Sequence, residues 1–152
     1  MQTASLTATA RTRIHGSPEK VFAAFTEAAQ MSRFWFYRND AGLVAGEKVT
    51  WSLGNEADAF SFEVTVKVLE APEKLVIEWP GPDGNTTEVM WTFEGTPEGD
   101  TILTIVESGF QGSDDAIINS VLDSTGGLNQ VRIAAKALVE NGVGINILAA
   151  PD

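Results

Sequence analysis

The sequence predicts an α+β fold in which a curved antiparallel sheet packs against a long C-terminal helix. Short segments with alternating apolar residues follow one another from residue 46 to residue 108, with no helical pattern between them. This order is typical of an antiparallel meander and excludes a parallel α/β sheet. Beyond Gly112, apolar residues recur at a spacing near 3.6 as far as Leu138, which indicates a long helix.

The N-terminal part predicts one strand and two short helices. Apolar and polar residues alternate from Ser5 to Ile14, as in a half-buried strand. Ser17 then offers a helix cap, and Pro18 suits the first helical position. We expect a first helix after Ser17 and a second, short helix over residues 29–35.

Five strands are expected next, each with one apolar face. The clearest runs from Phe60 to Val68, where apolar and polar residues alternate. The last strand covers Thr101 to Ser108, and its alternation fits two phases because both sets of residues are apolar. One of these phases turns Leu103, Ile105 and Glu107 inward.

The predicted C-terminal helix carries two apolar stripes separated by Gly126-Gly127. The glycine pair predicts either a break in the helix or a close approach of the helix to the sheet. Asn141-Gly142 is a typical helix stop. The segment that starts at Val143 is mostly apolar at first, so we expect it to pack on the body of the protein.

Composition limits the possible functions. The 152 residues fit one domain over residues 1–152, and the formal net charge of −11 disfavours partners such as nucleic acid or anionic lipid. With no cysteine and one histidine, His15, we expect no disulfide, transition-metal site or cofactor. No stretch is long and apolar enough for membrane insertion, and the start lacks a signal-peptide pattern, so we expect a cytoplasmic protein.

Five pieces of the sequence, in this order, resemble the START-related (SRPBCC) superfamily. They are residues 17–25, the Phe34-Trp35 pair, residues 68–75, residues 99–110 and residues 126–142. Within that superfamily they are most similar to the bacterial branch named after the homologue of the activator of the heat-shock chaperone ATPase. That branch often has a tryptophan near the start of the last helix, where this chain has leucine.

The resemblance covers nearly the whole chain and implies a helix-grip fold. In this fold a curved sheet of six or seven strands grips the C-terminal helix, and a hydrophobic cavity lies between them. Lipid carriers and polyketide aromatases and cyclases belong to the superfamily. Binding of a hydrophobic ligand is the property they share, and only some of them are enzymes.

The candidate ligand site combines large aromatic side chains with three polar ones. Aromatic residues usually build a core, so core packing and pocket lining both stay open for them. An inward Glu107 could orient a polar group of a ligand or act as an acid or base, although it could equally be a solvated or paired carboxylate. Gln111 and Asn129 could be its polar partners, or ordinary loop and helix-surface residues. The candidate ligand-binding residues are Trp35, Trp51, Phe60, Phe62, Trp79, Trp91, Phe93, Glu107, Phe110, Gln111 and Asn129.

Three functions stay open at this point. The first is binding of a small hydrophobic molecule, lipid-like or polycyclic aromatic, between the sheet and the last helix. The second is an enzyme of the cyclase or hydrolase type, with Glu107 as acid or base. The third is a non-enzymatic interaction module or homodimer, which would use the apolar tail and an outer sheet face that carries Val76, Met90 and Ile102.

Overall fold

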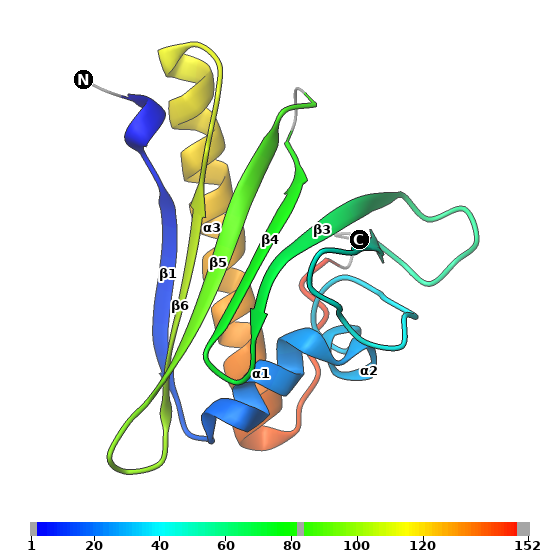
Figure 1. The fold of residues 1–152 in the computed structure, drawn as a ribbon, viewed down its shortest axis with the longest axis vertical. Coiled ribbons are helices and arrows are strands. Elements are labelled where there is room, and N and C mark those ends of the chain that lie inside the picture. The colour runs from blue at the N-terminus through cyan, green and yellow to red at the C-terminus, as the bar shows by residue number, and fades with distance from the viewer. Residues whose placement is uncertain (1–2, 82–83, 149–152) are drawn as a thin grey trace.

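The computed structural model describes residues 3–81 and 84–148 and confirms the predicted α+β helix-grip fold. Within these residues, six antiparallel strands form one sheet in the order β1-β6-β5-β4-β3-β2, which curves in front of a long helix (Figure 1). The end of the predicted apolar tail, residues 149–152, lies outside the described part. The strands are β1 (Ala8–Ile14), β2 (Lys48–Ser52), β3 (Ser61–Glu70), β4 (Lys74–Pro80), β5 (Thr86–Gly95) and β6 (Thr101–Ser108).

The helices are a 3-10 turn η1 (Thr3–Ser5), α1 (Pro18–Thr26), α2 (Ala28–Met31) and α3 (Asp114–Asn141). Ser17 caps α1 as predicted, because its Oγ accepts a hydrogen bond of 3.3 Å from the Lys20 amide. The second helix is shorter than predicted. The Ser32 hydroxyl accepts a bond of 3.1 Å from the Arg38 amide and so draws the chain back across the end of α2. Among the described residues, no helix is both long and apolar enough to span a membrane.

Helix α3 runs without interruption through Gly126-Gly127, so the predicted break is wrong. The predicted close approach is wrong as well, since a Cβ atom added to either glycine would meet nothing within 4 Å. Buried residues on both sides of the pair, including Ile117 and Leu128, hold the helix against the body. This packing outweighs the helix propensity lost at the two glycines, about 1 kcal/mol each.

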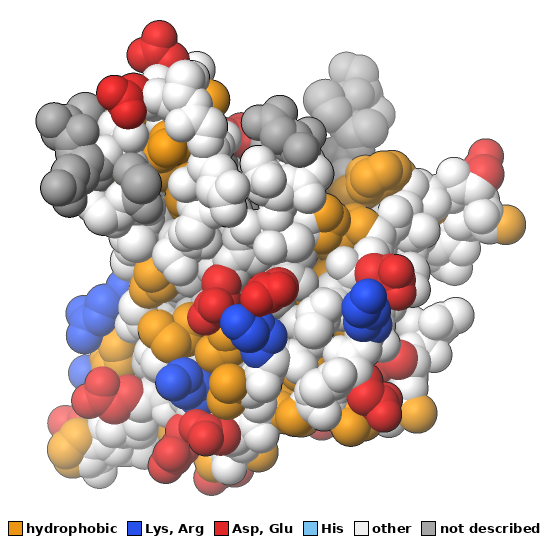
Figure 2. Space-filling model, turned by 45° about the horizontal axis from the view of Figure 1, so that its top comes forward, with side chains coloured by type: hydrophobic (Ala, Val, Ile, Leu, Met, Phe, Trp, Pro, Cys, Tyr) orange, Lys and Arg blue, Asp and Glu red, His pale blue; other side chains and the backbone are white. Residues whose placement is uncertain are grey.

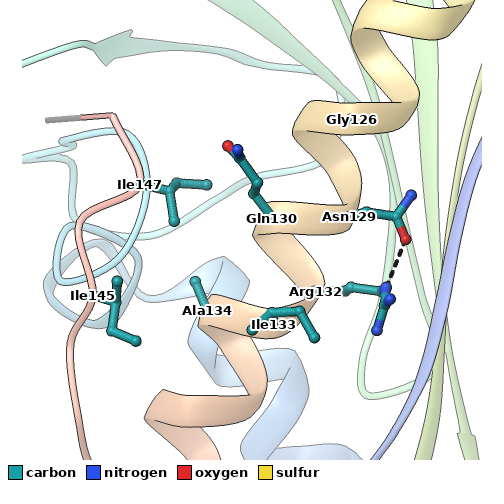
Figure 3. Close-up of a pocket in the computed structure, with 8 residues that line it drawn as sticks. All are labelled: Gly126, Asn129, Gln130, Arg132, Ile133, Ala134, Ile145 and Ile147. Atoms are coloured by element: carbon teal, nitrogen blue, oxygen red, sulfur yellow. Dashed lines mark hydrogen bonds between the residues drawn. The ribbon is translucent and has the colours of Figure 1, made fainter. Parts of the chain in front are cut away.

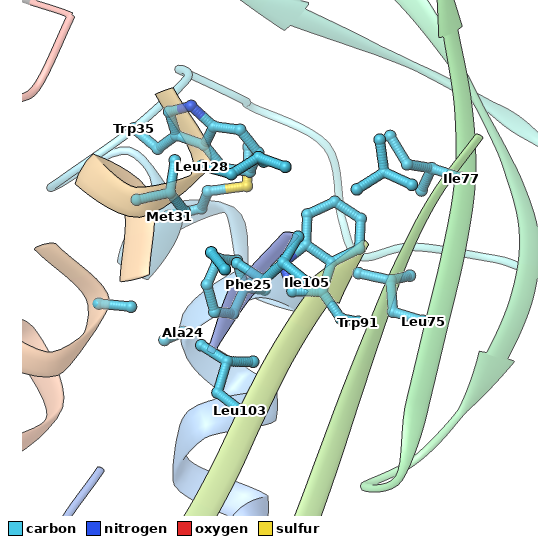
Figure 4. Close-up of a cluster of buried hydrophobic side chains, with 14 of the residues drawn as sticks. Ala24, Phe25, Met31, Trp35, Leu75, Ile77, Trp91, Leu103, Ile105 and Leu128 are labelled. Carbon is cyan, nitrogen blue, oxygen red and sulfur yellow. The ribbon is translucent and has the colours of Figure 1, made fainter. Parts of the chain in front are cut away.

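The core fills the concave side of the sheet (Figure 4). Trp91 from β5 and Phe25 from α1 face each other, with ring centroids 5.8 Å apart. Trp35, just after α2, packs 6.1 Å from Trp91. Each of these three side chains is at least 97 % buried, with exposed fractions of 1 % for Phe25, 3 % for Trp35 and 0 % for Trp91. Aromatic packing therefore joins the α1–α2 layer to the centre of the sheet.

Two apolar residues face differently from the prediction. Phe60 precedes β3 instead of belonging to it, and its side chain is 67 % exposed with its ring 6.2 Å from that of Phe62. Val76, expected on an exposed outer face, is only 4 % exposed. Its cross-strand neighbours Val68 and Met90 flank it on both sides, and neighbours at this spacing shield one another from solvent.

Side chains of α3 also bond to the outer edge of β1, the edge that does not pair with β6. Asn129 donates to the carbonyl of Thr9 at 3.3 Å, and Lys136 donates to the carbonyl of Arg13 at 2.6 Å. Glu140 accepts from the His15 amide at 2.8 Å. Burial alone would raise the pKa of Glu140, but the hydrogen bond from His15 and the bond and charge of Lys136 lower it.

A buried arginine fixes the chain where it leaves α1. The side chain of Arg38 has 0 % exposure and donates to the carbonyls of Phe25 and Thr26, each at 3.1 Å. Two further bonds, of 2.8 and 2.7 Å, run to the carboxylate of Asp40. Burial would raise the pKa of Asp40, but the bonds and charge of Arg38 and the Gly42 amide bring it below its ordinary value.

Candidate functional site

A buried carboxylate lies at the end of β6. Of the two phases that the sequence left open for β6, the structure has the one that turns Leu103, Ile105 and Glu107 inward. Glu107 is only 3 % exposed, and its Oε2 accepts hydrogen bonds from Trp79 Nε1 at 3.0 Å and from the Thr87 hydroxyl at 2.5 Å. Trp79 Nε1 also lies 2.8 Å from Thr87 Oγ1. The other oxygen, Oε1, is buried and has no hydrogen-bond partner among the described residues.

Sheet register brings these three side chains together. Trp79 of β4 lies opposite Thr87 of β5, and Val89 of β5 lies opposite Glu107 of β6. Thr87 and Val89 are two positions apart and so point to the same face. Thr87 was missing from the predicted site, although its alternation with Val89, Trp91 and Phe93 in the sequence would have placed it on the inner face.

Glu107 lines two hollows between the sheet and α3. The smaller has a volume of about 190 Å³ and the wider about 340 Å³. Both are lined by Trp79, Glu107, Asp123 and Ser124, so they are neighbouring parts of one region, which we call the inner site. The smaller hollow adds Trp35, Phe36, Gly127, Leu128, Gln130, Val131, Ile147 and Leu148, and the wider one adds Pro80, Gly81, Thr87, Phe110, Asn119 and Ser120.

Helix α3 supplies one wall of the inner site from residues spaced three or four apart. Ser120, Asp123, Ser124 and Gly127 lie on one helical face at this spacing. Asp123 is absent from the predicted site, because nothing in the sequence fixes which face of the helix turns toward the sheet. Gly127 contributes no side chain, so space stays open at this point of the helix.

The segment after α3 forms another wall. It is tied down where Arg33 donates to the carbonyl of Gly142 at 2.8 Å and where the Ile147 amide donates to the carbonyl of Phe34 at 3.3 Å. Ile147 and Leu148 therefore reach the smaller hollow. The expectation that this apolar segment packs on the body holds for Ile147 and Leu148, whereas Val143 and Ile145 stay about half exposed.

A third hollow, of about 530 Å³, lies between α3 and the segment that follows it, and it shares Gln130 and Ile147 with the smaller hollow of the inner site (Figure 3). Ile145 and Ile147 face Gln130 and Ala134 across it, and Ile133 lies on the same outward surface of the helix. We call it the outer groove. The residues that line it are Gly126, Asn129, Gln130, Arg132, Ile133, Ala134, Ile145 and Ile147.

The predicted site residues fall into three groups. Trp35, Trp79, Glu107 and Phe110 line the inner site. A second group packs in the core or beside it: Trp51, Trp91 and Phe93 are buried, and Phe62 packs 5.1 Å from Phe36. The third group lies elsewhere: Phe60 and Gln111 are exposed, and Asn129 is at the outer groove.

The polar atoms of these residues distinguish their roles. The amide nitrogen of Asn129 donates to the carbonyls of Thr9 and Thr125, and its oxygen accepts from Arg132 Nε. The polar atoms of this side chain are therefore bonded to residues other than Glu107. The indole N–H groups of Trp51 and Trp91 are buried without a hydrogen-bond partner in the described part of the chain. No three His, Cys, Asp or Glu side chains within residues 3–81 and 84–148 are gathered in a way that could hold a metal ion.

One family matches most of the chain. The sequence model of the family described as activator of Hsp90 ATPase homolog 1-like protein matches residues 15–129. The chain belongs to this family. Solved structures with this helix-grip fold share little sequence with the chain, and no curated protein matches it.

Three of these structures show how the fold recurs at low identity. Protein SSP2350 from Staphylococcus saprophyticus is 22 % identical with a TM-score of 0.74, over 95 % of this chain and 100 % of that one. DynU16, a protein of the dynemicin biosynthetic locus, is 20 % identical with a TM-score of 0.75, over 91 % of this chain and 48 % of its own. The chain thus spans about half the length of DynU16.

The third structure is the Aha1 dimer from Colwellia psychrerythraea, which is 19 % identical with a TM-score of 0.64, over 90 % of this chain and 98 % of that one. At these identities the likeness shows a shared fold and no shared activity.

Proposed function

We propose that this chain is a cytoplasmic binding protein for a small, mainly apolar molecule, lipid-like or polycyclic aromatic, held in the inner site. One observation carries the proposal: a nearly fully buried carboxylate, Glu107, lines two hollows between the sheet and α3. Ligand sites typically measure about 300–1,000 Å³ and combine apolar walls with a few fixed polar groups. The wider hollow, about 340 Å³, falls in that range, and the smaller one adjoins it.

The walls suit such a ligand. Trp79 of β4, Trp35 and Phe36 after α2, and Phe110 after β6 make these walls aromatic. The Trp79–Thr87–Glu107 hydrogen bonds hold the buried carboxylate in one orientation. A fixed polar group in an apolar setting gives a site specificity for ligand orientation.

Two adjacent glycines provide a matched test. Gly127 lines the inner site, whereas Gly126 lines the outer groove, and neither has a neighbour within 4 Å of an added Cβ. We expect Gly127→Leu to fill the inner site and abolish binding, while Gly126→Leu leaves it intact. Binding is measured by quenching of tryptophan fluorescence with a panel of lipids, flavonoids and polyketide-like aromatics, because Trp79 and Trp35 line the site.

Saturable quenching that Gly127→Leu removes and Gly126→Leu preserves would support the proposal. Equal loss in both variants, or no response of the wild type to any compound, would contradict it. Trp91 is a poor site for such a test, because it is fully buried and lines none of these hollows, so Trp91→Ala would damage the core instead.

Catalysis on the same site has weaker support. The enzyme hypothesis takes Glu107 as acid or base and needs Gln111 and Asn129 to orient the substrate. Of these three, Glu107 alone lines the inner site, Gln111 is exposed, and Asn129 is bonded at the edge of β1. We therefore favour binding over cyclase- or hydrolase-type chemistry.

Self-association is a second candidate, favoured by the outer groove. Ile133, Val143 and Ile145 are 49 %, 50 % and 47 % exposed, and they place apolar surface along α3 and the segment that follows it. Exposed apolar patches of this kind often mark protein contacts. We expect light scattering after gel filtration to give a dimer mass that falls to the monomer mass in the double variant Ile133→Ser, Ile145→Ser. A wild type that stays monomeric at high concentration would argue against this candidate.

A further inference from the structure

We propose that the ligand of the inner site carries a protonated amine, which binds at Glu107 beneath the aromatic walls. This inference rests on the proposed function and specifies its ligand. It starts from the charges that line the two hollows. Glu107 and Asp123 each line both of them, and the described linings contain no lysine, arginine or histidine. A lipid carboxylate or a phosphate would find no charge partner there and two like charges.

One oxygen of Glu107 lacks a hydrogen-bond donor, and an amine could supply one. Oε2 already accepts from Trp79 and Thr87, while Oε1 accepts from no described residue. A buried carboxylate oxygen without a donor is costly, and an ammonium group brings three donors. Oε1 is closed off from solvent in the structure, so the amine reaches it by displacing the side chains that cover it.

The aromatic residues support the same chemistry. An organic cation is attracted to the face of a tryptophan or phenylalanine ring within about 6 Å. Trp79 takes part in both the bonding of Glu107 and the attraction of a cation to an aromatic ring. Its indole N–H donates to the carboxylate, and its half-buried ring lines both hollows. Trp35, Phe36 and Phe110 extend this wall.

The charge of the whole protein acts in the same direction. The formal net charge is −11, and on the face shown in Figure 2 acidic side chains are spread among basic and apolar ones. A field of this sign raises the local concentration of cations and repels anions. Exposed Asp123, which lines both hollows, places one negative charge where a ligand enters from solvent.

The test uses four naphthalene probes of nearly equal size: 1-naphthylmethylamine, 1-naphthalenemethanol, 1-methylnaphthalene and 1-naphthoate. Titration calorimetry at pH 7 measures each Kd. We expect the amine to bind about tenfold or more tightly than the alcohol, since a charge-assisted bond is worth more than a neutral one, and the carboxylate to bind most weakly. Glu107→Gln should reduce the preference for the amine over the alcohol to near one, and Asp123→Asn should reduce it in part.

A matched control is Glu63→Gln, which removes one exposed carboxylate from β3 and should leave the preference unchanged. Thermal unfolding of each variant verifies folding, and Asp123→Asn keeps the test decisive if Glu107→Gln is unstable. Binding of the neutral probes without an amine preference would overturn this inference and leave the proposed function standing. An amine preference that survives Glu107→Gln in a folded protein would also overturn it. Failure of all four probes to bind would overturn this inference, and would overturn the proposed function as well if the panel of lipids, flavonoids and polyketide-like aromatics also gives no quenching.

Discussion

Replacing the glycine pair in α3 by alanine should stabilise the protein. Gly126 and Gly127 lie inside the helix, both are exposed, and an added methyl group would meet no atom within 4 Å at either position. Each replacement therefore gains helix propensity without a clash, about 0.8–1 kcal/mol per site. The double variant should gain about 2 kcal/mol, which for a chain of this size raises Tm by roughly 4–8 °C.

Urea unfolding followed by far-UV circular dichroism measures this gain. Gly142→Ala is the matched control, because Gly142 ends the same helix with a φ of 68° and a side chain there is strained. Gly142→Ala should lower the free energy of unfolding by about 1 kcal/mol. A double alanine variant that is no more stable than the wild type would refute the reasoning, and would indicate that the helix is locally irregular at the pair in solution.

Three further predictions concern the rest of the fold. Arg38→Met should lower the free energy of unfolding by about 3–5 kcal/mol, because two helix carbonyls lose their side-chain donor and Asp40 keeps only the Gly42 amide. A loss below about 1 kcal/mol in urea unfolding would contradict this. The folded-state pKa of Asp40 is lowered, so the stability that its carboxylate contributes is present above its ordinary value of 3.8 and is lost as pH falls through the lower folded-state pKa. The free energy of unfolding that Asp40→Asn loses relative to the wild type should therefore shrink below about pH 4. A loss that does not change between pH 7 and pH 3 would count against the Arg38 pairing. Ser113→Ala should lower the free energy of unfolding by about 1 kcal/mol, because the Ser113 hydroxyl accepts a hydrogen bond from the Ala116 amide at the start of α3. Equal thermal stability of variant and wild type would argue against this cap.

Local patterns in the sequence were sufficient to predict the fold. Alternation predicted the strands, and Ser17, Pro18 and Gly142 marked helix ends that the structure confirms. These signals work because side-chain period and capping chemistry depend on neighbours in the chain. The uninterrupted α3 is the main exception, since contacts distant in sequence decide whether a glycine pair breaks a helix.

The inner site was only partly predictable. Glu107 and Trp79 could be placed on inner faces by alternation, but the pairing of Trp79 with Thr87 depends on sheet register. The contribution of Asp123 depends on how α3 rotates against the sheet, which contacts distant in sequence decide. Phe60 shows the opposite failure, because alternation extended the strand one residue too far into a loop.

The contacts between α3 and β1 also bear on aggregation. An outer strand normally leaves a row of free backbone groups on which a strand from another molecule can assemble. Here the carbonyls of Thr9 and Arg13 are already bonded to Asn129 and Lys136, so a second chain could extend the sheet at this side only if α3 first detached. At the opposite end of the sheet, Tyr37 exchanges backbone bonds of 2.9 and 3.0 Å with Ser52 of β2 and occupies part of that strand. The fold thus covers the outer edge of β1 and part of the outer edge of β2, which limits amyloid-like growth at both ends of the sheet.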